Sequence, residues 1–229
     1  MRGWLLFALL LALAALVWSR GWRPPDRFNP LAPLDLRAPP DLFLRYKLAR
    51  LDDDPARCKA ALTAAGATFQ ALPDHDTGNG CGWRDAVRLR GTGAAMLATP
   101  TLVTCPLAAS LVLFDRQVLQ PGARASFGSG VRTVDHVGSF ACRNLYSQAG
   151  AARSRHAAAE AIDVTGFRLA DGQRITLARD WQRVGKRGEF LRGLQRDGCR
   201  YFGTILGPDY NPEHSTHFHM QSGGIGICR

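Results

Sequence analysis

Apolar positions at the start of the chain form one unbroken run. It extends from Trp4 to Trp18. Its length suits the apolar core of a signal peptide and is short for a helix that spans a bilayer. However, no small-x-small cleavage site follows, and tryptophan at both ends is typical of a spanning helix. We therefore expect residues 1–19 to be an inner-membrane anchor, or otherwise a signal peptide, although the basic residues that follow weaken the anchor.

Proline dominates the next segment. Residues 20–40 contain six prolines. Because proline removes backbone donors and favours an extended chain, a stiff linker is expected there. The folded part then covers residues 41–229, which is long enough for one domain with a substantial core.

Beyond the linker, the apolar pattern predicts both helices and strands. Helices are expected over residues 54–66, 107–120 and 186–198. Asp54 can cap the first helix and Gly66 can end it, and Pro121 with Gly122 is expected to end the second. Strand-like runs occupy residues 86–91, 98–105, 131–143, 160–169, 174–181, 201–207 and 217–221. Since these strands and helices do not alternate regularly, we expect an α+β domain with a mainly antiparallel sheet flanked by helices.

The net charge of +10 bears on partners rather than on the fold. It indicates an anionic partner: nucleic acid, a membrane surface or an acidic cell-wall polymer. No basic run is interleaved with aromatic residues, so nucleic acid is not expected. For an exported chain, a wall polymer such as peptidoglycan is the favoured partner.

The six cysteines indicate an oxidising compartment. They are well separated and include no CxxC pair, which disfavours a zinc ribbon and favours three disulfides. Sequential pairing closes the shortest loops, although the spacing leaves other connectivities open. The expected bonds are Cys58–Cys81, Cys105–Cys142 and Cys199–Cys228.

Histidines are concentrated near the C-terminus. Three of the six lie between His214 and His219, and His156 stands seven residues before Asp163 in an alanine-rich stretch. Imidazole and carboxylate are ligands that zinc accepts, and a catalytic zinc site uses three of them. His217 and His219 would share a strand face, so that one can bind metal while the other moves a proton.

The two histidine segments resemble a known superfamily. Residues 154–163 resemble the S-x-H-x-x-G-x-A-x-D motif of the lysostaphin, D-Ala-D-Ala-peptidase and hedgehog zinc peptidases, with Ala159 in place of the glycine. The segment 217–219 matches their H-x-H motif. The resemblance implies a zinc-peptidase core with Zn²⁺ as cofactor. The metal ligands that it implies are His156, Asp163 and His219. It also implies that Arg143, in a segment similar to S-G-Y-R, and Ser154 bind substrate.

From about Asp53 to Arg229 the chain is similar to the extensin-like C-terminal domain family of bacteria. Within the superfamily, the general base varies between branches. Thr216 replaces the glutamate of one branch, whereas His214, His217 and His219 reproduce the H-x-x-H-x-H of another, and Glu213 matches the spacing of the hedgehog glutamate. We expect His217 to be the base or transition-state stabiliser, with Glu213 or His214 as a catalytic partner. Both partners also suit a solvated loop.

These features together predict a periplasmic, zinc-dependent peptidase that cuts peptidoglycan peptides, as an endopeptidase or a carboxypeptidase. Two other interpretations keep the same fold. One is a zinc-containing envelope-binding module with little or no hydrolysis, and the other is a purely structural envelope domain. The sequence leaves the bond cleaved and the oligomeric state open.

Overall fold

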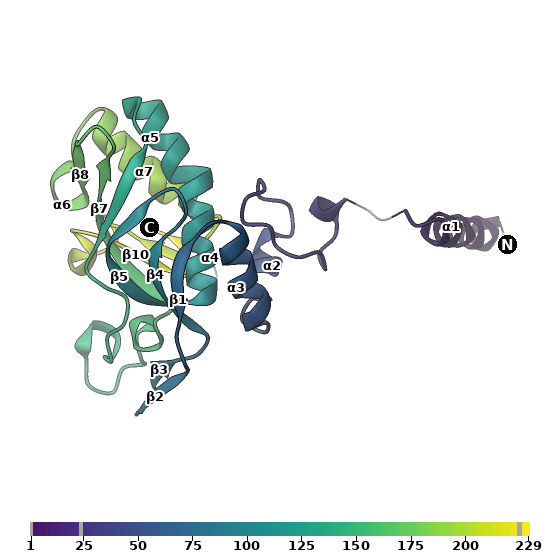
Figure 1. Ribbon diagram of the computed structural model, residues 1–229, viewed down its shortest axis with the longest axis horizontal. Helices are drawn as coiled ribbons and strands as arrows, with labels where there is room; N and C mark the ends of the chain where they lie inside the picture. The colour runs from purple at the N-terminus through teal and green to yellow at the C-terminus, as the bar shows by residue number, and fades with distance from the viewer. Residues whose placement is uncertain (1, 23–24, 224–225) are drawn as a thin grey trace.

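The chain forms a mixed α/β structure around one large sheet (Figure 1). The computed structural model describes residues 2–22, 25–223 and 226–229. Residue 1 of the predicted anchor, residues 23 and 24 of the predicted linker, and residues 224 and 225 of the predicted domain lie outside the described residues. Within these described ranges the main sheet has nine strands in the order β1-β4-β5-β6-β7-β10-β9-β11, with β8 also paired to β7.

The sheet is mainly antiparallel, as expected, but includes two parallel pairs, β5 with β6 and β9 with β11. Its strands are β1 Thr68–Ala71, β4 Ala86–Gly91, β5 Met96–Thr104, β6 Val131–His136, β7 Ala161–Leu169, β8 Arg174–Thr176, β9 Thr204–Leu206, β10 Phe218–Gln221 and β11 Ile227–Cys228. A separate hairpin consists of β2 His75–Gly78 and β3 Cys81–Trp83. This hairpin projects beyond one end of the main sheet (Figure 1).

All helices except α1 lie around the sheet, and α1 lies apart from it (Figure 1). The helices are α1 Arg2–Ser19, α2 Leu44–Ala49, α3 Pro55–Ala64, α4 Cys105–Phe114, α5 Gln120–Phe127, α6 Leu177–Asp180 and α7 Lys186–Gly198. Helix α4 is buried along its whole length and packs against strands β4 and β5 and helices α2 and α3. The predicted cap of α3 is confirmed, because the Asp54 side chain accepts a hydrogen bond from the amide of Arg57.

Several predicted element boundaries are wrong; for example, the strand predicted over residues 131–143 ends at His136. Pro121 and Gly122 do not end the second helix; the chain forms a wider π-helical turn over Asp115–Leu119 and continues as α5 until Gly128, which adopts a left-handed φ of 69°. A proline removes one helical donor, yet it is tolerated in the first turn of a helical segment. The predicted strand 174–181 ends at Thr176, and helix α6 follows directly. The buried Asp180 carboxylate accepts a hydrogen bond from the Thr176 amide, which stabilises the start of this helix.

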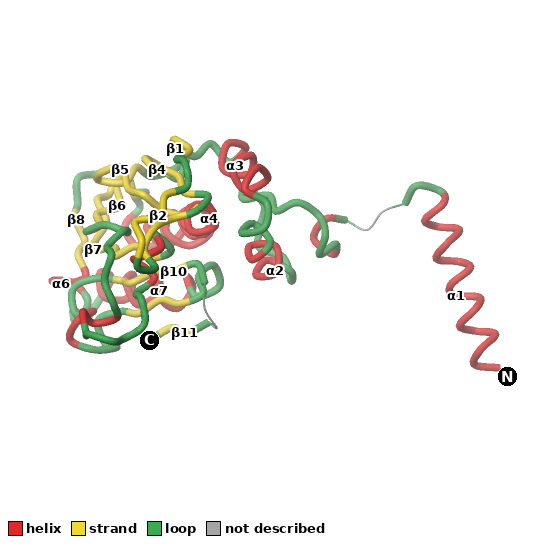
Figure 2. The backbone as a smooth tube through the Cα atoms, turned by 90° about the horizontal axis from the view of Figure 1, so that it is seen from below, coloured by secondary structure: helices red, strands yellow, loops and turns green. Residues whose placement is uncertain are grey.

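Part of the proline-rich segment packs against the body of the protein. Leu36 is only 1% exposed, and the Lys47 ammonium donates to the Asp26 carbonyl and to the Asp41 carboxylate. In both views helix α1 lies apart from the rest of the protein, while α2 and α3 cover the side that faces it (Figure 2). No helix within the described residues combines the length and apolarity needed to cross a membrane. This finding differs from the anchor predicted for residues 1–19.

Three disulfides link the described cysteines, but two of the predicted pairings are wrong. The bonds are Cys58–Cys105, Cys81–Cys142 and Cys199–Cys228. Packing explains the change: helix α3 lies against the start of α4, so Cys58 meets Cys105, whereas Cys81 lies on the separate hairpin. Cys58 and Cys81, although consecutive cysteines in the sequence, are therefore not bonded to each other.

Removing the Cys58–Cys105 bond by a double serine substitution is expected to cost roughly 2–5 kcal/mol of the free energy of unfolding. The bond closes a separation of 47 residues, and both cysteines are fully buried. Denaturant unfolding of the variant beside the parent measures the loss. Peptide mapping of the unreduced parent supplies the control, and a fragment joining Cys58 to Cys81 would contradict the assignment.

Candidate metal centre

His156 is held in place by the short 3₁₀ helix Arg155–Ala158. Ser154 precedes this helix, and its hydroxyl accepts a hydrogen bond from the His156 amide at 3.3 Å. The imidazole Nδ1 lies 2.7 Å from the Ser139 carbonyl oxygen. Since a carbonyl only accepts, Nδ1 carries the proton, and Nε2 presents its lone pair to the site. The side chain that the sequence places in a substrate-binding role, Ser154, is buried here and positions His156.

The helix ends at Ala159, which adopts a left-handed φ of 55°. This position matches the glycine of the superfamily motif. A left-handed conformation costs a non-glycine residue about 1–2 kcal/mol. Alanine at this position therefore strains the backbone where glycine would not. The turn returns the chain directly into strand β7.

Strand pairing brings the other two candidate ligands together. Strands β7 and β10 are antiparallel neighbours, and their register places His219 directly opposite Asp163. Strand β10 also pairs with β9 on its other edge, so both residues lie within the sheet. Two side chains far apart in the sequence are thus fixed by a hydrogen-bonded ladder rather than by a mobile loop.

The three side chains form a nearly equilateral triangle. His156 Nε2 lies 3.2 Å from Asp163 Oδ1, His219 Nδ1 lies 3.1 Å from the same oxygen, and the two nitrogens are 3.1 Å apart. Ligand atoms around a tetrahedral zinc ion are about 3.3 Å from one another. The donor set and its spacing therefore fit one face of a zinc tetrahedron. Within the described residues, this is the one group of His, Cys, Asp or Glu side chains placed closely enough to hold a metal ion.

The environment keeps Asp163 ionised. Burial acts to raise the pKa of this carboxyl, but the imidazoles of His156, His219 and His217 beside it hold the pKa well below its usual range. An ionised carboxylate beside two imidazoles is the protonation state that a divalent metal ion requires.

Gln221 orients the second imidazole. Its amide nitrogen donates to the Gly223 carbonyl at 2.8 Å, so its amide oxygen faces His219 Nε2, at 3.1 Å. This hydrogen bond places the His219 proton on Nε2 and leaves Nδ1 free to bind metal. Sequence reasoning missed Gln221, although the period of two along β10 puts it on the same face as His219.

Two further imidazoles border the triangle. His217 Nε2 lies 3.6 Å from Asp163 Oδ1, and the ring of His214 lies 5.3 Å from that of His217 and 5.7 Å from that of His219. Burial, together with the neighbouring His219 and His217, lowers the pKa of His214 to about 4. Burial also lowers the pKa of His217, assisted by nearby positive charge. Both rings are therefore neutral at neutral pH and able to accept a proton.

The remaining predicted residues lie at the edge of the site. Arg143 is exposed, and its positive charge contributes to the lowered pKa of His217. Glu213 is exposed on the 3₁₀ helix Pro212–His214 and, among the described residues, takes part in no hydrogen bond or ion pair. Its negative charge acts to raise the pKa of His214, against the larger effect of burial.

A hydrogen-bonded chain that the sequence did not indicate supports His214. The Asn211 side chain contacts the Nδ1 atom of His214 and donates to the Tyr146 hydroxyl at 3.2 Å. Tyr146 has a left-handed φ of 52°. The single asparagine and tyrosine carry no spacing signal, because the contact depends on two loops meeting in space.

Comparisons with known proteins give one match. The family described as the C-terminus of extensin-like proteins matches residues 56–229, which include every residue of the triangle and its surroundings. No curated protein and no solved structure matches the chain.

Proposed function

Because the chain belongs to the family of extensin-like protein C-termini, we propose that it is an exported, zinc-dependent peptidase that acts on peptidoglycan peptides. The observation that carries the proposal is the triangle of His156, Asp163 and His219. Three ligands of this kind leave one tetrahedral position for water or substrate, which is the arrangement of a catalytic zinc site. The proposal includes membership of the lysostaphin, D-Ala-D-Ala-peptidase and hedgehog superfamily.

Each residue of the site has a part in this proposal. Bound zinc supplies Lewis-acid activation of water and of the scissile carbonyl. His217 is neutral and lies beside the ligand triangle, so it accepts a proton as the base or stabilises the developing oxyanion. Arg143 is exposed near His217 and binds a carbonyl or carboxylate of the substrate.

Export and a wall substrate agree with the rest of the molecule. Three disulfides suit an oxidising compartment such as the periplasm. The net charge of +10 favours an anionic polymer such as peptidoglycan over a neutral one.

One observation favours the alternative of a zinc-containing envelope-binding module. Among the described residues, no carboxylate other than Asp163 makes a hydrogen bond or ion pair with His217 or with the triangle. If His217 does not serve as base, the site binds metal but lacks a proton acceptor.

Digestion of purified peptidoglycan distinguishes the two functions. The protein is expected to release peptide products, a chelator is expected to stop the release, and added zinc is expected to restore it. Chromatography of the soluble products measures the reaction and shows which bond is cut. A metal-loaded protein that binds the wall but releases nothing would establish the binding module instead.

A further inference from the structure

A pocket with three basic side chains lies where the chain passes from helix α6 to helix α7. It has a volume of about 390 Å³ and is lined by Arg183, Lys186 and Arg187, together with uncharged residues of the same region and of the end of α5. No acidic residue and none of the candidate metal ligands lines it. Strand β8 and helix α6 stand at the opposite end of the sheet from the β2–β3 hairpin (Figure 1).

A buried aspartate holds three guanidinium groups together at this place. Asp180 has 0% of its surface exposed, and its Oδ1 atom lies 3.4 Å from Arg183 Nε and 3.6 Å from Arg187 Nη1. Arg179 Nη2 lies 3.2 Å from Oδ2 of the same carboxylate. Because Arg183 and Arg187 lie against the same oxygen atom, their guanidiniums are close enough to bind one oxyanion together.

A second pair of arginines extends the positive charge onto strands β7 and β8. Arg168 and Arg174 both pair with the buried Asp135 carboxylate, at 2.8 and 3.0 Å. The Arg174 carbonyl accepts hydrogen bonds from Arg179 and Arg187, which joins the two groups. Within this network of described residues, five guanidiniums share two carboxylates, so that a surplus of three positive charges remains.

Arg183 keeps hydrogen-bonding capacity for a ligand. Its side chain is 56% exposed and its Nε atom faces Asp180, whereas its two terminal nitrogens make no hydrogen bond within the described structure. The backbone beneath it is closely packed, since a Cβ atom on Gly188 would lie 2.0 Å from the Arg183 carbonyl oxygen. A guanidinium with a fixed base and a free terminal fork suits bidentate recognition of a carboxylate.

Apolar surface lies beside these donors. Val184 is 100% exposed and lines the pocket, as does the partly buried Phe127. A single exposed apolar side chain is common on protein surfaces, but this one stands next to Arg183 in a basic pocket. A ligand that carries a carboxylate beside a short aliphatic group would cover both kinds of surface.

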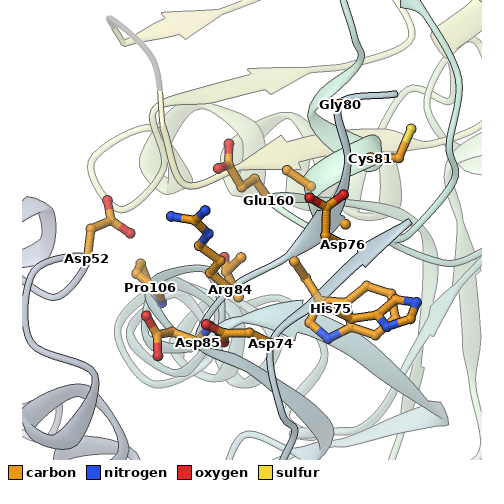
Figure 3. Close-up of a pocket in the computed structure, with 14 residues that line it drawn as sticks. Asp52, Asp74, His75, Asp76, Gly80, Cys81, Arg84, Asp85, Pro106 and Glu160 are labelled. Carbon is orange, nitrogen blue, oxygen red and sulfur yellow. Dashed lines mark hydrogen bonds between the residues drawn. The ribbon is translucent and has the colours of Figure 1, made fainter. Parts of the chain in front are cut away.

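Acidic side chains gather at another part of the molecule. A pocket beside the β2–β3 hairpin is lined by five carboxylates and one guanidinium, that of Arg84 (Figure 3). An anionic polymer is therefore attracted to the arginine network rather than to the hairpin. Helix α1 lies far from β8 and α6 in both views (Figures 1 and 2). A lipid surface in contact with the apolar side chains of α1 would not meet the arginines, which favours a polymer over a membrane.

We propose that the pocket lined by Arg183 and Arg187 is a second docking site for the wall polymer, where it binds a carboxylate of a peptidoglycan stem peptide while Val184 contacts the aliphatic part. The identity of the polymer rests on the proposed function, whereas the site itself lies apart from the metal centre. Two separate contacts with one polymer raise the effective concentration of substrate at the second contact. The docking site thus holds the protein on an insoluble substrate while the metal centre acts.

Cosedimentation of the full chain with purified, insoluble peptidoglycan tests the proposal. A chelator is present, so that cleavage does not remove the polymer during the measurement. The parent is expected to bind untreated peptidoglycan at least tenfold more tightly than peptidoglycan whose carboxyl groups have been converted to methylamides. Soluble polyglutamate is expected to compete more strongly than polyphosphate of equal charge. The reverse order would assign the pocket to phosphate and overturn the choice of a carboxylate.

Matched variants locate the binding. Arg183→Gln is expected to weaken binding about tenfold, because a charge-assisted contact is lost, and Arg183→Lys is expected to restore only part of it, since lysine lacks the planar fork. Val184→Glu places a negative charge in the pocket at a fully exposed position, so it is expected to weaken binding without lowering the unfolding midpoint. Arg196→Gln serves as control, because it removes the same charge from the other end of α7, where the side chain is 74% exposed.

The outcomes separate the docking site from the peptidase. The docking site is overturned if methylamidated peptidoglycan binds as tightly as the untreated polymer, or if Arg183→Gln and Arg196→Gln bind alike. A parent that binds through the pocket yet releases no peptides in the digestion experiment supports the docking site and refutes the peptidase.

Discussion

A His156→Ala variant is expected to be isolated without a metal ion, beside a parent that holds about one zinc per chain. His156 contributes one of three ligand atoms that lie 3.1–3.2 Å apart. Removing it leaves one imidazole and one carboxylate, which is too few for a stable zinc site. Elemental analysis of both proteins, after dialysis against the same trace of zinc, measures the difference.

His75→Ala provides the matched control for this experiment. His75 lies on strand β2, is exposed, and stacks on Trp83 with ring centroids 4.7 Å apart. Its loss is expected to leave the metal content unchanged. Circular dichroism shows whether both variants remain folded. Equal zinc in the parent and in a folded His156→Ala protein would remove His156 from the ligand set.

A His217→Ala variant is expected to keep its metal and to lose peptidoglycan cleavage about a hundredfold or more. The His217 ring borders the ligand triangle without completing it, since its Nε2 is 3.6 Å from the Asp163 oxygen. A fourth protein ligand would occupy the position that water or substrate needs. The free imidazole is therefore assigned to proton transfer or to stabilisation of the oxyanion.

Two further variants separate the roles around His217. His219→Ala is expected to lose both metal and cleavage, because His219 belongs to the triangle. Glu213→Gln is expected to have a mild effect, since Glu213 is exposed and does not contact His217. If Glu213→Gln proves as severe as His217→Ala, the glutamate is the base. A His217→Ala protein that cleaves as fast as the parent would end the catalytic assignment of His217.

Much of the fold follows from local signals. The cap at Asp54, the helix 186–198 and the strand-like run that becomes β7 are all encoded by residues within or next to each element. Local signals failed where tertiary contacts decide. The helix continues past Pro121 within a densely packed region, and the disulfide partner of Cys58 depends on how α3 lies against α4.

The candidate metal site shows the same division. The resemblance to the zinc-peptidase motifs selected His156, Asp163 and His219, and the structure brings these three side chains together. Two of the groups that orient the imidazoles of the site were not predictable. Ser139 enters through a backbone carbonyl, which any residue possesses, and Asn211 enters through a meeting of two loops.

The pairing of β7 with β10 also determines when the site assembles during folding. His219 stands 56 residues after Asp163, so the ligand triangle closes only when this long-range strand pair forms. Contacts of high sequence separation require a large loss of chain entropy and form late. A chain still being exported, or one whose last strand has not docked, therefore presents two ligands rather than three. If the site binds metal as proposed, capture of the ion therefore follows the formation of this strand pair, and a chain without the pair carries no assembled site.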